Sequence, residues 1–292
     1  MACGTHRKAG MSKIKQTTMI NFENVSFGYR GGRLFDGLRL ELRRGAVYGL
    51  LGKNGAGKTT LLKLTAGLLF PRSGEITVLG RVPRKREPGF LSEVFLLPEE
   101  FDLPRMNMND YARVYGCFYP NFSRGQLSEL MRELEVSESQ CLHRMSFGQK
   151  KKACIAFAIA CNTPLLLMDE PTNGLDIPSK SSFRRLIASV ADENRTIVIS
   201  THQVRDLDRL IDSVVVLDGS EILLNATTGE VTEKLRFVHL EENEPALYAE
   251  QTVHGRWGVQ PNESGDESPL DMELLFNAAV ANREAVKQLF KR

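Results

Sequence analysis

The amino-acid sequence predicts an α/β fold built around a mostly parallel sheet. Three short apolar runs, interpreted as buried strands at 165–168, 196–200 and 214–217, are separated by helical or polar stretches. A further apolar run, Ala46–Leu51, leads directly into a glycine-rich loop and then into a stretch with helical periodicity. Strands that alternate with helices along a chain usually pair in parallel, with the helices packed on the faces of the sheet.

The first hundred residues contain more segments with the character of strands. Residues 20–27 alternate apolar with polar side chains, which we interpret as an edge strand, and 38–42 alternate in the same way. A helix is expected from about 58 to 69, where Phe70-Pro71 ends it because proline cannot continue a helix. Two further strands are expected at 75–79 and 93–97.

Residues 107–144 change to helical periodicity, with Pro120 between two expected helices. We therefore place a helical insert at about 100–148, inside an otherwise alternating chain. The pattern weakens after Asp218-Gly219. The chain is accordingly divided into a loose N-terminal tail at 1–18, a main domain at 19–220 and a C-terminal extension at 221–292.

Within the extension, residues 237–240 and 252–259 each have the pattern of a short strand, and 260–268 is a polar loop. A helix is expected over 269–290, with Ser268 as its N-cap and Pro269 in its first position.

Composition excludes several classes of protein. The 292 residues carry 38 Lys+Arg against 36 Asp+Glu, and this net charge of +2 gives no indication of a nucleic-acid surface. The five cysteines are odd in number and lack Cys-x-x-Cys spacing, so neither a disulfide framework nor a zinc site is expected. The best uncharged apolar stretch, 153–161, falls well below the about 20 residues of a spanning helix.

One motif indicates binding of a nucleoside triphosphate. Gly52–Thr59 fits G-x-x-x-x-G-K-[ST] and has a strand before it and a helix after it, as the motif requires. The backbone N–H groups of such a loop surround phosphate oxygens, and the helix N-terminus adds positive potential. Lys58 would reach the β- and γ-phosphates, and Thr59 would ligate Mg²⁺. The run of candidate nucleotide-binding residues is Gly52, Lys53, Asn54, Gly55, Ala56, Gly57, Lys58, Thr59 and Thr60.

A pair of carboxylates follows the apolar run 165–168. Asp169 stands at the carboxyl end of a buried strand, which is where α/β sheets place ligands, and it would hold Mg²⁺ directly or through water. Glu170 would then polarise the attacking water as a general base. Many strands end in a polar loop, so two acids after a strand are a weak signal by themselves. The phosphate loop upstream is what makes a catalytic role for this pair the favoured interpretation.

Ser146, Gly148 and Gln149 precede a stretch with helical periodicity. Ser146 is a good N-cap, and taken alone that structural role is the better interpretation. The N-terminus of the same helix is also a site for an anion, and one bound phosphate would use both features.

This ordered set of motifs resembles the ATP-binding subunit of ABC transporters. The likeness covers about 19–219 and includes the phosphate loop, the signature at 145–149 and the acidic strand at 165–170. It continues through 171–176 and the strand-terminal Ser200-Thr201-His202. The pattern and the resemblance together predict a P-loop NTPase core with an N-terminal antiparallel β subdomain, an inserted helical subdomain and a small C-terminal α+β extension.

The resemblance implies that two such domains pack head to tail, as a homodimer or as a pseudo-dimer with a paralogue. Ser146, Gly148 and Gln149 of one copy would then contact the γ-phosphate held by the other, and Asp176 would lie in the loop that crosses the seam. His202 would contact the γ-phosphate and help to position the water. Tyr29 matches the aromatic residue that stacks on adenine, with Phe27 as a rival.

Two positions depart from the pattern of that family. Phe147 stands where the signature usually has a glycine. Its larger side chain is expected to leave less space at the N-terminus of the helix that follows. Glu99 takes the place of a glutamine that ligates Mg²⁺ and senses the membrane partner. A carboxylate ligates Mg²⁺ as well as an amide does, but its added charge would retune hydrolysis. The variant resembles a subset of bacterial export-type and bacitracin-resistance-like subunits.

The leading hypothesis is an ATPase subunit that drives a separate transmembrane permease from the cytoplasmic face of the cell membrane, using ATP and Mg²⁺ and no nucleic acid. The alternative is a soluble ABC-type ATPase that acts on ribosomes or nucleic acid, although such proteins usually carry two ATPase domains or a long coiled coil. A GTPase is disfavoured because the chain has no Asn-Lys-x-Asp motif. A small-molecule kinase would leave the signature and His202 without a role.

Overall fold

The computed structural model describes residues 18–207, 210–253 and 255–291. The tail expected at 1–18 therefore lies, apart from Thr18, outside the described residues. The central element is a six-stranded sheet in which five strands run parallel and the last is antiparallel. In spatial order its strands are β5 (Val94–Leu97), β6 (Leu165–Asp169), β7 (Thr196–Thr201), β3 (Val47–Leu51), β8 (Ser213–Asp218) and β9 (Glu221–Thr227).

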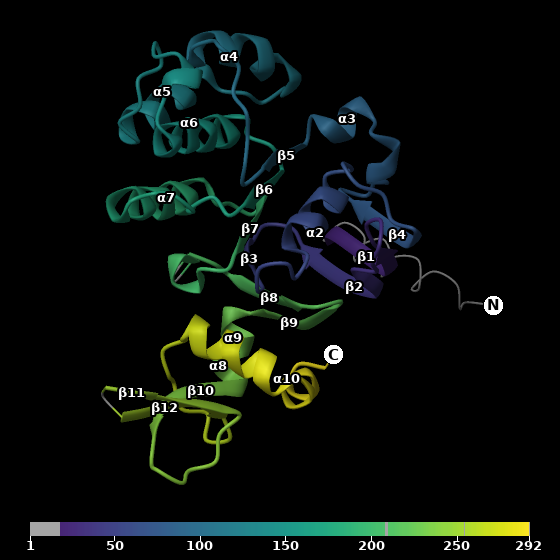
Figure 1. Cartoon of the computed structure of the whole chain (residues 1–292), viewed down its shortest axis with the longest axis vertical. Coiled ribbons are helices and arrows are strands. Elements are labelled where there is room, and N and C mark those ends of the chain that lie inside the picture. The colour runs from purple at the N-terminus through teal and green to yellow at the C-terminus, as the bar shows by residue number, and fades with distance from the viewer. Residues whose placement is uncertain (1–17, 208–209, 254, 292) are drawn as a thin grey trace, which may run out of the picture.

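Both faces of this sheet are buried, and the side chains of β6, for example, pack alternately into two hydrophobic clusters, one on either face. Leu165 and Leu167 of β6 belong to one hydrophobic cluster, and Leu166 and Met168 belong to the other. Helix α2 (Lys58–Thr65) lies on one face, and α6 (Phe147–Ala160) and α7 (Ile177–Val190) lie on the other (Figure 1). Burial on both faces explains why these strands are continuous apolar runs.

A three-stranded antiparallel sheet covers the α2 side of the core. Its strands are β1 (Thr18–Phe27), β2 (Phe35–Arg43) and β4 (Ser73–Val78), in the order β2-β1-β4. The expectation of an edge strand at 20–27 is therefore wrong, because β1 pairs with a neighbour on each side. Alternation of apolar and polar residues reports one exposed face of a sheet and carries no information about an edge.

The helical insert leaves the sheet after β5 and returns to it at the neighbouring strand β6. It lies at the top of Figure 1, away from the antiparallel sheet. It contains α4 (Met108–Tyr115), the 3₁₀ turn η2 (Gly116–Phe118), α5 (Arg124–Glu133), the 3₁₀ turn η3 (Leu142–Arg144) and α6. Before β5, the chain forms η1 (Pro83–Lys85) and α3 (Pro88–Leu91).

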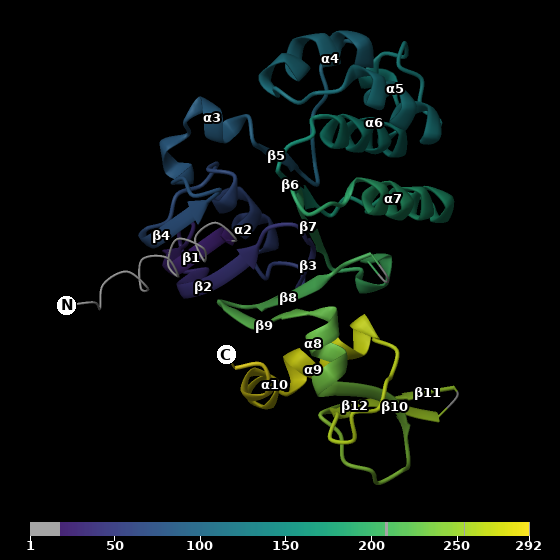
Figure 2. The same ribbon diagram turned by 180° about the vertical axis from the view of Figure 1, so that it is seen from behind.

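The C-terminal extension is an α+β unit at the opposite end of the molecule (Figures 1 and 2). A short turn, η4 (Val204–Leu207), precedes β8. After β9 come α8 (Thr228–Lys234), β10 (Leu235–Leu240), β11 (Tyr248–Thr252), β12 (Gly255–Pro261), α9 (Met272–Ala281) and α10 (Arg283–Leu289). The three strands form an antiparallel sheet in the order β10-β12-β11.

Three expected elements have different boundaries in the structure. The helix expected at 58–69 ends at Thr65, because Gly67 takes a left-handed conformation with φ of 68°. The strand expected at 252–259 is a hairpin, with β11 ending at Thr252 and β12 beginning at Gly255.

The helix expected at 269–290 is two helices, α9 and α10. Asp271 is the N-cap of α9 and accepts bonds from the backbone N–H groups of Glu273 and Leu274. The hydroxyl of Ser268 accepts a bond from the backbone N–H of Phe237 at 2.9 Å. None of the helices in the described ranges has the length and apolar character needed to cross a bilayer.

Candidate functional site

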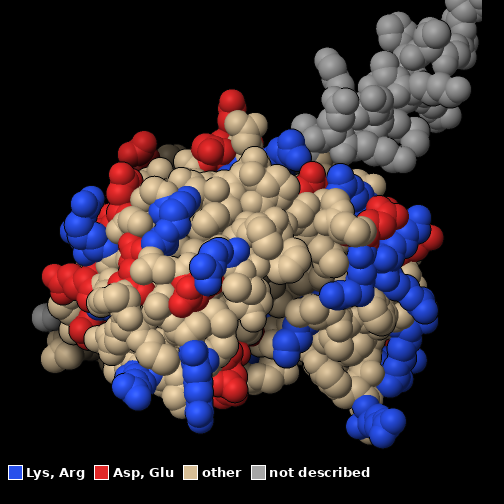
Figure 3. Space-filling view, turned by 90° about the horizontal axis from the view of Figure 1, so that it is seen from above, with Lys and Arg blue, Asp and Glu red and all other residues tan. Residues whose placement is uncertain are grey.

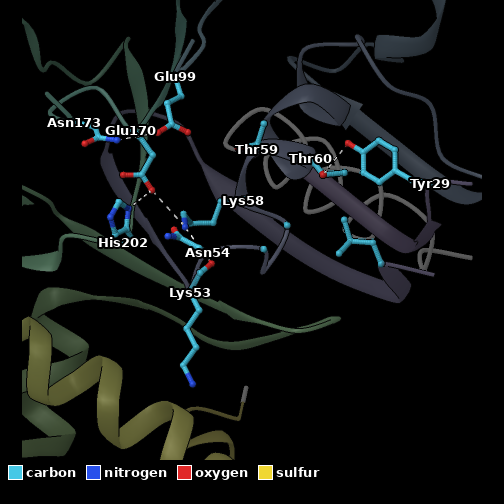
Figure 4. Close-up of a pocket in the computed structure, with 13 residues that line it drawn as sticks. Tyr29, Lys53, Asn54, Lys58, Thr59, Thr60, Glu99, Glu170, Asn173 and His202 are labelled. Carbon is cyan, nitrogen blue, oxygen red and sulfur yellow. Dashed lines mark hydrogen bonds and ion pairs between the residues drawn. The ribbon is translucent and has the colours of Figure 1, made fainter. Parts of the chain in front are cut away.

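A pocket of about 580 Å³ opens where the carboxyl ends of the central strands meet the start of α2. It gathers side chains from the segments that follow β1, β5, β6 and β7, from the loop after β3 and from the start of α2 (Figure 4). Ligand sites of proteins commonly have volumes of this size. The lining residues are Tyr29, Leu34, Lys53, Asn54, Gly55, Gly57, Lys58, Thr59, Thr60, Glu99, Glu170, Asn173 and His202.

The glycines at both ends of the loop 52–57 stand where other residues would not fit. Gly57, just before α2, has φ of 104°, and a Cβ there would lie 2.8 Å from the Phe35 ring. A Cβ on Gly52 would lie 2.6 Å from the carbonyl oxygen of Leu217. Ala56 is buried, and its N–H donates to the carbonyl of Lys53 at 3.1 Å, which closes the turn.

Lys58 points back into this loop. Its ammonium donates to the carbonyl oxygens of Gly52 at 2.8 Å and Lys53 at 3.3 Å, and the side chain is buried. The same ammonium lies 3.4 Å from Oε1 of Glu170. A positive charge is therefore fixed between the loop and the acidic end of β6.

Asp169 is held by two hydroxyl groups. Thr59 Oγ1 donates to Oδ2 at 2.6 Å, and Ser200 Oγ donates to Oδ1 at 2.5 Å. The residue is buried, with 2% of its surface exposed. A carboxylate and a hydroxyl in contact form a set of hard oxygen donors of the kind that Mg²⁺ prefers.

Glu170 is buried between two basic groups and lies at the pocket wall. Its Oε1 is 2.9 Å from Nδ1 of His202, and both this contact and the one with Lys58 are drawn in Figure 4. The backbone of Glu170 has φ of 45°, a conformation that non-glycine residues rarely adopt and that is found most often at functional sites. The backbone N–H donates to the carbonyl of Ser200, which fixes this turn to β7.

Glu99 reaches the pocket from the end of β5. Its Oε1 accepts a bond from the amide of Asn173 at 2.9 Å. Glu99, which replaces the expected glutamine, therefore lines the same pocket as Glu170.

Tyr29 lies at the far side of the pocket. Its hydroxyl is 3.1 Å from Oγ1 of Thr60, and its ring packs edge-on against Phe27. Tyr29 is 51% exposed, whereas the rival Phe27 is buried in the core. Of the two rings, Tyr29 is the one with a free face.

Four candidate residues, three from the signature and one from the loop after the acidic strand, do not line this pocket. Ser146 and Gln149 form a capping box at the start of α6, with the Gln149 N–H donating to Ser146 Oγ at 3.3 Å. Gly148 lies next to the carbonyl of Gly174. Asp176 is the N-cap of α7, and the bonds it accepts from Ser179 hold the pKa of its carboxyl below the ordinary value.

The sequence reasoning missed three contributors to the site. Asn173 and Leu34 line the pocket, and Ser200 bonds Asp169. Ser200 ends the strand next to β6, so a polar residue at the shared edge of the sheet was the available signal. Leu34 gave none, since nothing local distinguishes it from a core leucine.

The comparisons with known proteins agree with this geometry. The profile of the family described as "ABC transporter" matches residues 35–173. The bacitracin transport ATP-binding protein BcrA of Bacillus licheniformis is 31% identical over 232 residues, which cover 77% of this chain and 72% of that protein. The ABC transporter ATP-binding protein YtrB of Bacillus subtilis is 28% identical over 206 residues, covering 70% of each chain.

Solved structures show the same fold. The ATP-binding subunit of an ABC transporter superposes with a TM-score of 0.67 at 25% identity, covering 73% of this chain and 91% of that one. An ATP-binding cassette solved as a post-hydrolysis dimer with ADP and phosphate has a TM-score of 0.64 at 21% identity, covering 72% and 98%. The phosphate loop, the acidic strand and these likenesses agree, and the chain belongs to the ATP-binding subunits of ABC transporters.

Proposed function

We propose that this chain binds ATP with Mg²⁺, hydrolyses it between two head-to-tail copies and thereby drives a separate membrane permease. The observation that carries the proposal is the placement of Glu170 at the pocket wall, with its Oε1 2.9 Å from His202 and 3.4 Å from Lys58. This arrangement puts a buried carboxylate beside the loop that surrounds phosphate.

The triphosphate lies over the loop 52–57, with Lys58 against the β- and γ-phosphates and Tyr29 under the base. Thr59, Asp169 and Glu99 are the residues that hold Mg²⁺, and they supply only hydroxyl and carboxylate oxygens. When bound there, the ion neutralises charge on the phosphate oxygens. The described residues contain no group of three or more His, Cys, Asp or Glu side chains that would hold a metal without the nucleotide.

Glu170 accepts the proton of the water that attacks the γ-phosphorus in line. His202 contacts the same carboxylate oxygen and so fixes the side chain of Glu170. It would also contact the γ-phosphate. General-base catalysis of this kind is worth about 10²–10⁴-fold in rate.

The second half of the site comes from another copy or from a paralogue. Ser146, Gly148 and Gln149 are at least partly exposed at the N-terminus of α6, and Asp176 is exposed at the start of α7. Hydrogen bonds from Ser146, Gly148 and Gln149 to the γ-phosphate held by the partner would each contribute about 1.5–3 kcal/mol. Their loss on hydrolysis opens the dimer.

The permease docks on the helical insert and the adjoining Glu99 segment, which places the chain at the inner face of the membrane. Figure 3 looks onto the end of the molecule that carries the insert and shows charged side chains on either side of a largely uncharged middle. Val114, Tyr115 and Phe118, on α4 and η2, are exposed large apolar residues of the insert. Exposed apolar groups of this kind are typical of protein contacts.

The test is the Glu170→Gln variant. It keeps the shape of the side chain and removes the proton acceptor, so we expect ATP to bind, turnover to fall by about 10²–10⁴-fold and a nucleotide-bound dimer to accumulate. Turnover is measured by phosphate release, and the dimer by sedimentation velocity with and without ATP. Glu233→Gln, on the exposed face of α8, is the matched control and should behave as the unmodified chain. Full turnover in Glu170→Gln would remove Glu170 from the role of base.

A further inference from the structure

Lys151 is a wholly buried lysine on the helix that begins with the signature. It lies one turn into α6 and has 0% of its surface exposed. Its ammonium donates to the backbone carbonyl of Glu99 at 3.0 Å. Lysine is almost never fully buried unless its charge is paired, so this position requires a physical explanation.

Two aromatic rings flank the same ammonium. Phe101 and Phe147 are stacked, with ring centroids 6.4 Å apart and an angle of 9° between their planes. Nζ of Lys151 lies 5.6 Å from the Phe101 centroid and 5.9 Å from that of Phe147. Both distances fall within the range of a cation–π interaction. Phe147, the residue in place of a signature glycine, is thereby joined to the segment that carries Glu99.

The carboxylates around the ammonium provide its countercharge. Burial lowers the pKa of Lys151, and the carboxylates nearby oppose that shift, Glu99 most strongly and then Asp169 and Glu170. The side chain of Glu99 is held from its other side by Asn173. Glu99, which departs from the usual glutamine, is therefore bonded to this cation through its backbone carbonyl, and its carboxylate favours the charged form of the lysine.

We propose that Lys151 is a positioning residue that holds the Glu99–Phe101 segment against the start of α6. Through this contact, nucleotide and Mg²⁺ bound at Glu99 in one half-site set the placement of Ser146, Gly148 and Gln149, which act on the partner's nucleotide. The two departures from the family pattern, Glu99 and Phe147, are parts of one connection whose centre is Lys151. The inference rests on the proposed function, since it needs a dimer with two composite sites.

The experiment uses the full chain with Glu170→Gln as the background, because this variant accumulates the closed dimer. Lys151→Met is added, which keeps the length of the side chain and removes its charge. We expect the dissociation constant of the ATP- and Mg²⁺-dependent dimer to rise about tenfold, as for a typical coupling between sites. Binding of ATP to the lone chain, measured with a fluorescent ATP analogue, should change by less than about twofold, because Lys151 does not line the pocket.

The readouts separate the possible failures. If the Glu170→Gln background does not dimerise with ATP and Mg²⁺, the proposed function fails. If that background dimerises and Lys151→Met dimerises equally well, only the role of Lys151 is lost. Equal losses of ATP binding and dimer formation would show a merely structural effect and would also overturn the proposal. Lys150→Met, a partly exposed neighbour with the same change of charge, is the control and should leave dimer formation unaltered.

A second variant tests the same contact if Lys151→Met fails to fold. Phe101→Leu removes one of the two rings but keeps an apolar side chain at a partly buried position. It should weaken the dimer in the same direction while ATP binding is kept, and a dimer of undiminished affinity would contradict the proposal.

Discussion

Phe147 and Gly174 show how one residue constrains another across the site. Gly174 has φ of 78°, and a Cβ built on it would lie 2.5 Å from the Phe147 ring. The ring therefore rests directly on the backbone of the loop that leads to Asp176. A larger side chain at position 147 is compatible with this loop only because position 174 has none.

Replacing Gly174 by alanine should destabilise the chain by about 1–2 kcal/mol, because the left-handed conformation disfavours any Cβ. The clash with Phe147 adds to this cost. The measurement is urea unfolding of Gly174→Ala, compared with the unmodified chain. In a Phe147→Gly background the same substitution should cost less, since the ring is gone, and an equal cost in both backgrounds would show that the ring does not press on this loop.

At this scale, the sequence predicted the residues whose chemistry is local. The phosphate loop, Asp169 and Glu170 were recognisable because their order along the chain carries the motif. Lys151 and Asn173 were not assigned a role, because their meaning depends on Glu99, which lies 52 and 74 residues away along the chain. A lysine on a helix ordinarily predicts a solvated face, and only the fold shows that this one is buried.

At the scale of elements, ion pairs and one main-chain contact fasten the C-terminal helices to the rest of the chain. Arg283 at the start of α10 pairs with Asp218 at the end of β8. Lys287 lies 2.6 Å from Glu221 of β9, and Lys234 of α8 donates to the carbonyl of Leu289 at 2.7 Å. These contacts hold α10 against the last hairpin of the central sheet.

Lys287→Ala tests one of these contacts and its dependence on pH. The hydrogen bond and the charge of Lys287 lower the pKa of Glu221 below its ordinary value of 4.5. A carboxyl with a lowered pKa stabilises the folded state above its unfolded pKa and loses that contribution as the pH falls through the folded value. Because both side chains are partly exposed, we expect a loss of about 0.5 kcal/mol near pH 7.

The difference between Lys287→Ala and the unmodified chain should shrink as the pH falls below the ordinary pKa of Glu221. Urea unfolding followed by fluorescence of Trp257, the only tryptophan of the chain, reports on this part of the molecule. Glu221→Gln should show the same loss, and the double variant no more. A difference that stays constant at acidic pH would exclude the ion pair as its source.

The strands of the central sheet were predictable because burial on both faces leaves an unmistakable apolar run. The residues at which helices and strands begin and end were harder to predict. The strand expected at 252–259 proved to cover the end of one strand and the start of the next, since the interval between Thr252 and Gly255 is too short to be seen as a break in one sequence. Ser268 and Pro269 have the residue types typical of a helix N-terminus. The hydroxyl of Ser268, however, accepts a hydrogen bond from the backbone N–H of Phe237 and does not cap a helix.

For the whole molecule, the main prediction concerns assembly. If each site is shared between two copies, the turnover per chain should fall as the protein is diluted below the concentration at which the dimer dissociates. The measurement is phosphate release per molecule over a dilution series at saturating ATP. Turnover that is independent of dilution, at concentrations where only single chains sediment, would contradict the shared site.

Mixing two inactive variants provides the control for this assembly. Lys58→Ala removes the phosphate contact in one copy, and Gly148→Asp places a negative charge where the signature meets the γ-phosphate of the other. A Cβ on Gly148 would lie 3.6 Å from its nearest neighbour, the carbonyl of Gly174, so the lone chain accepts the change. An equal mixture should recover about a quarter of the unmodified turnover, because half of the dimers are mixed and each has one intact site.

The last strand of the central sheet has a further consequence for the solubility of the chain. β9 pairs with β8 on one side only, and its other side faces β2 and α10. Asn225 of β9 donates to the carbonyl of Glu41 in β2, so that part of the unpaired backbone already has a neighbour. Unpaired strand edges recruit strands from other molecules. Truncation before α10 would uncover this margin, and the shortened protein should then form aggregates by strand addition.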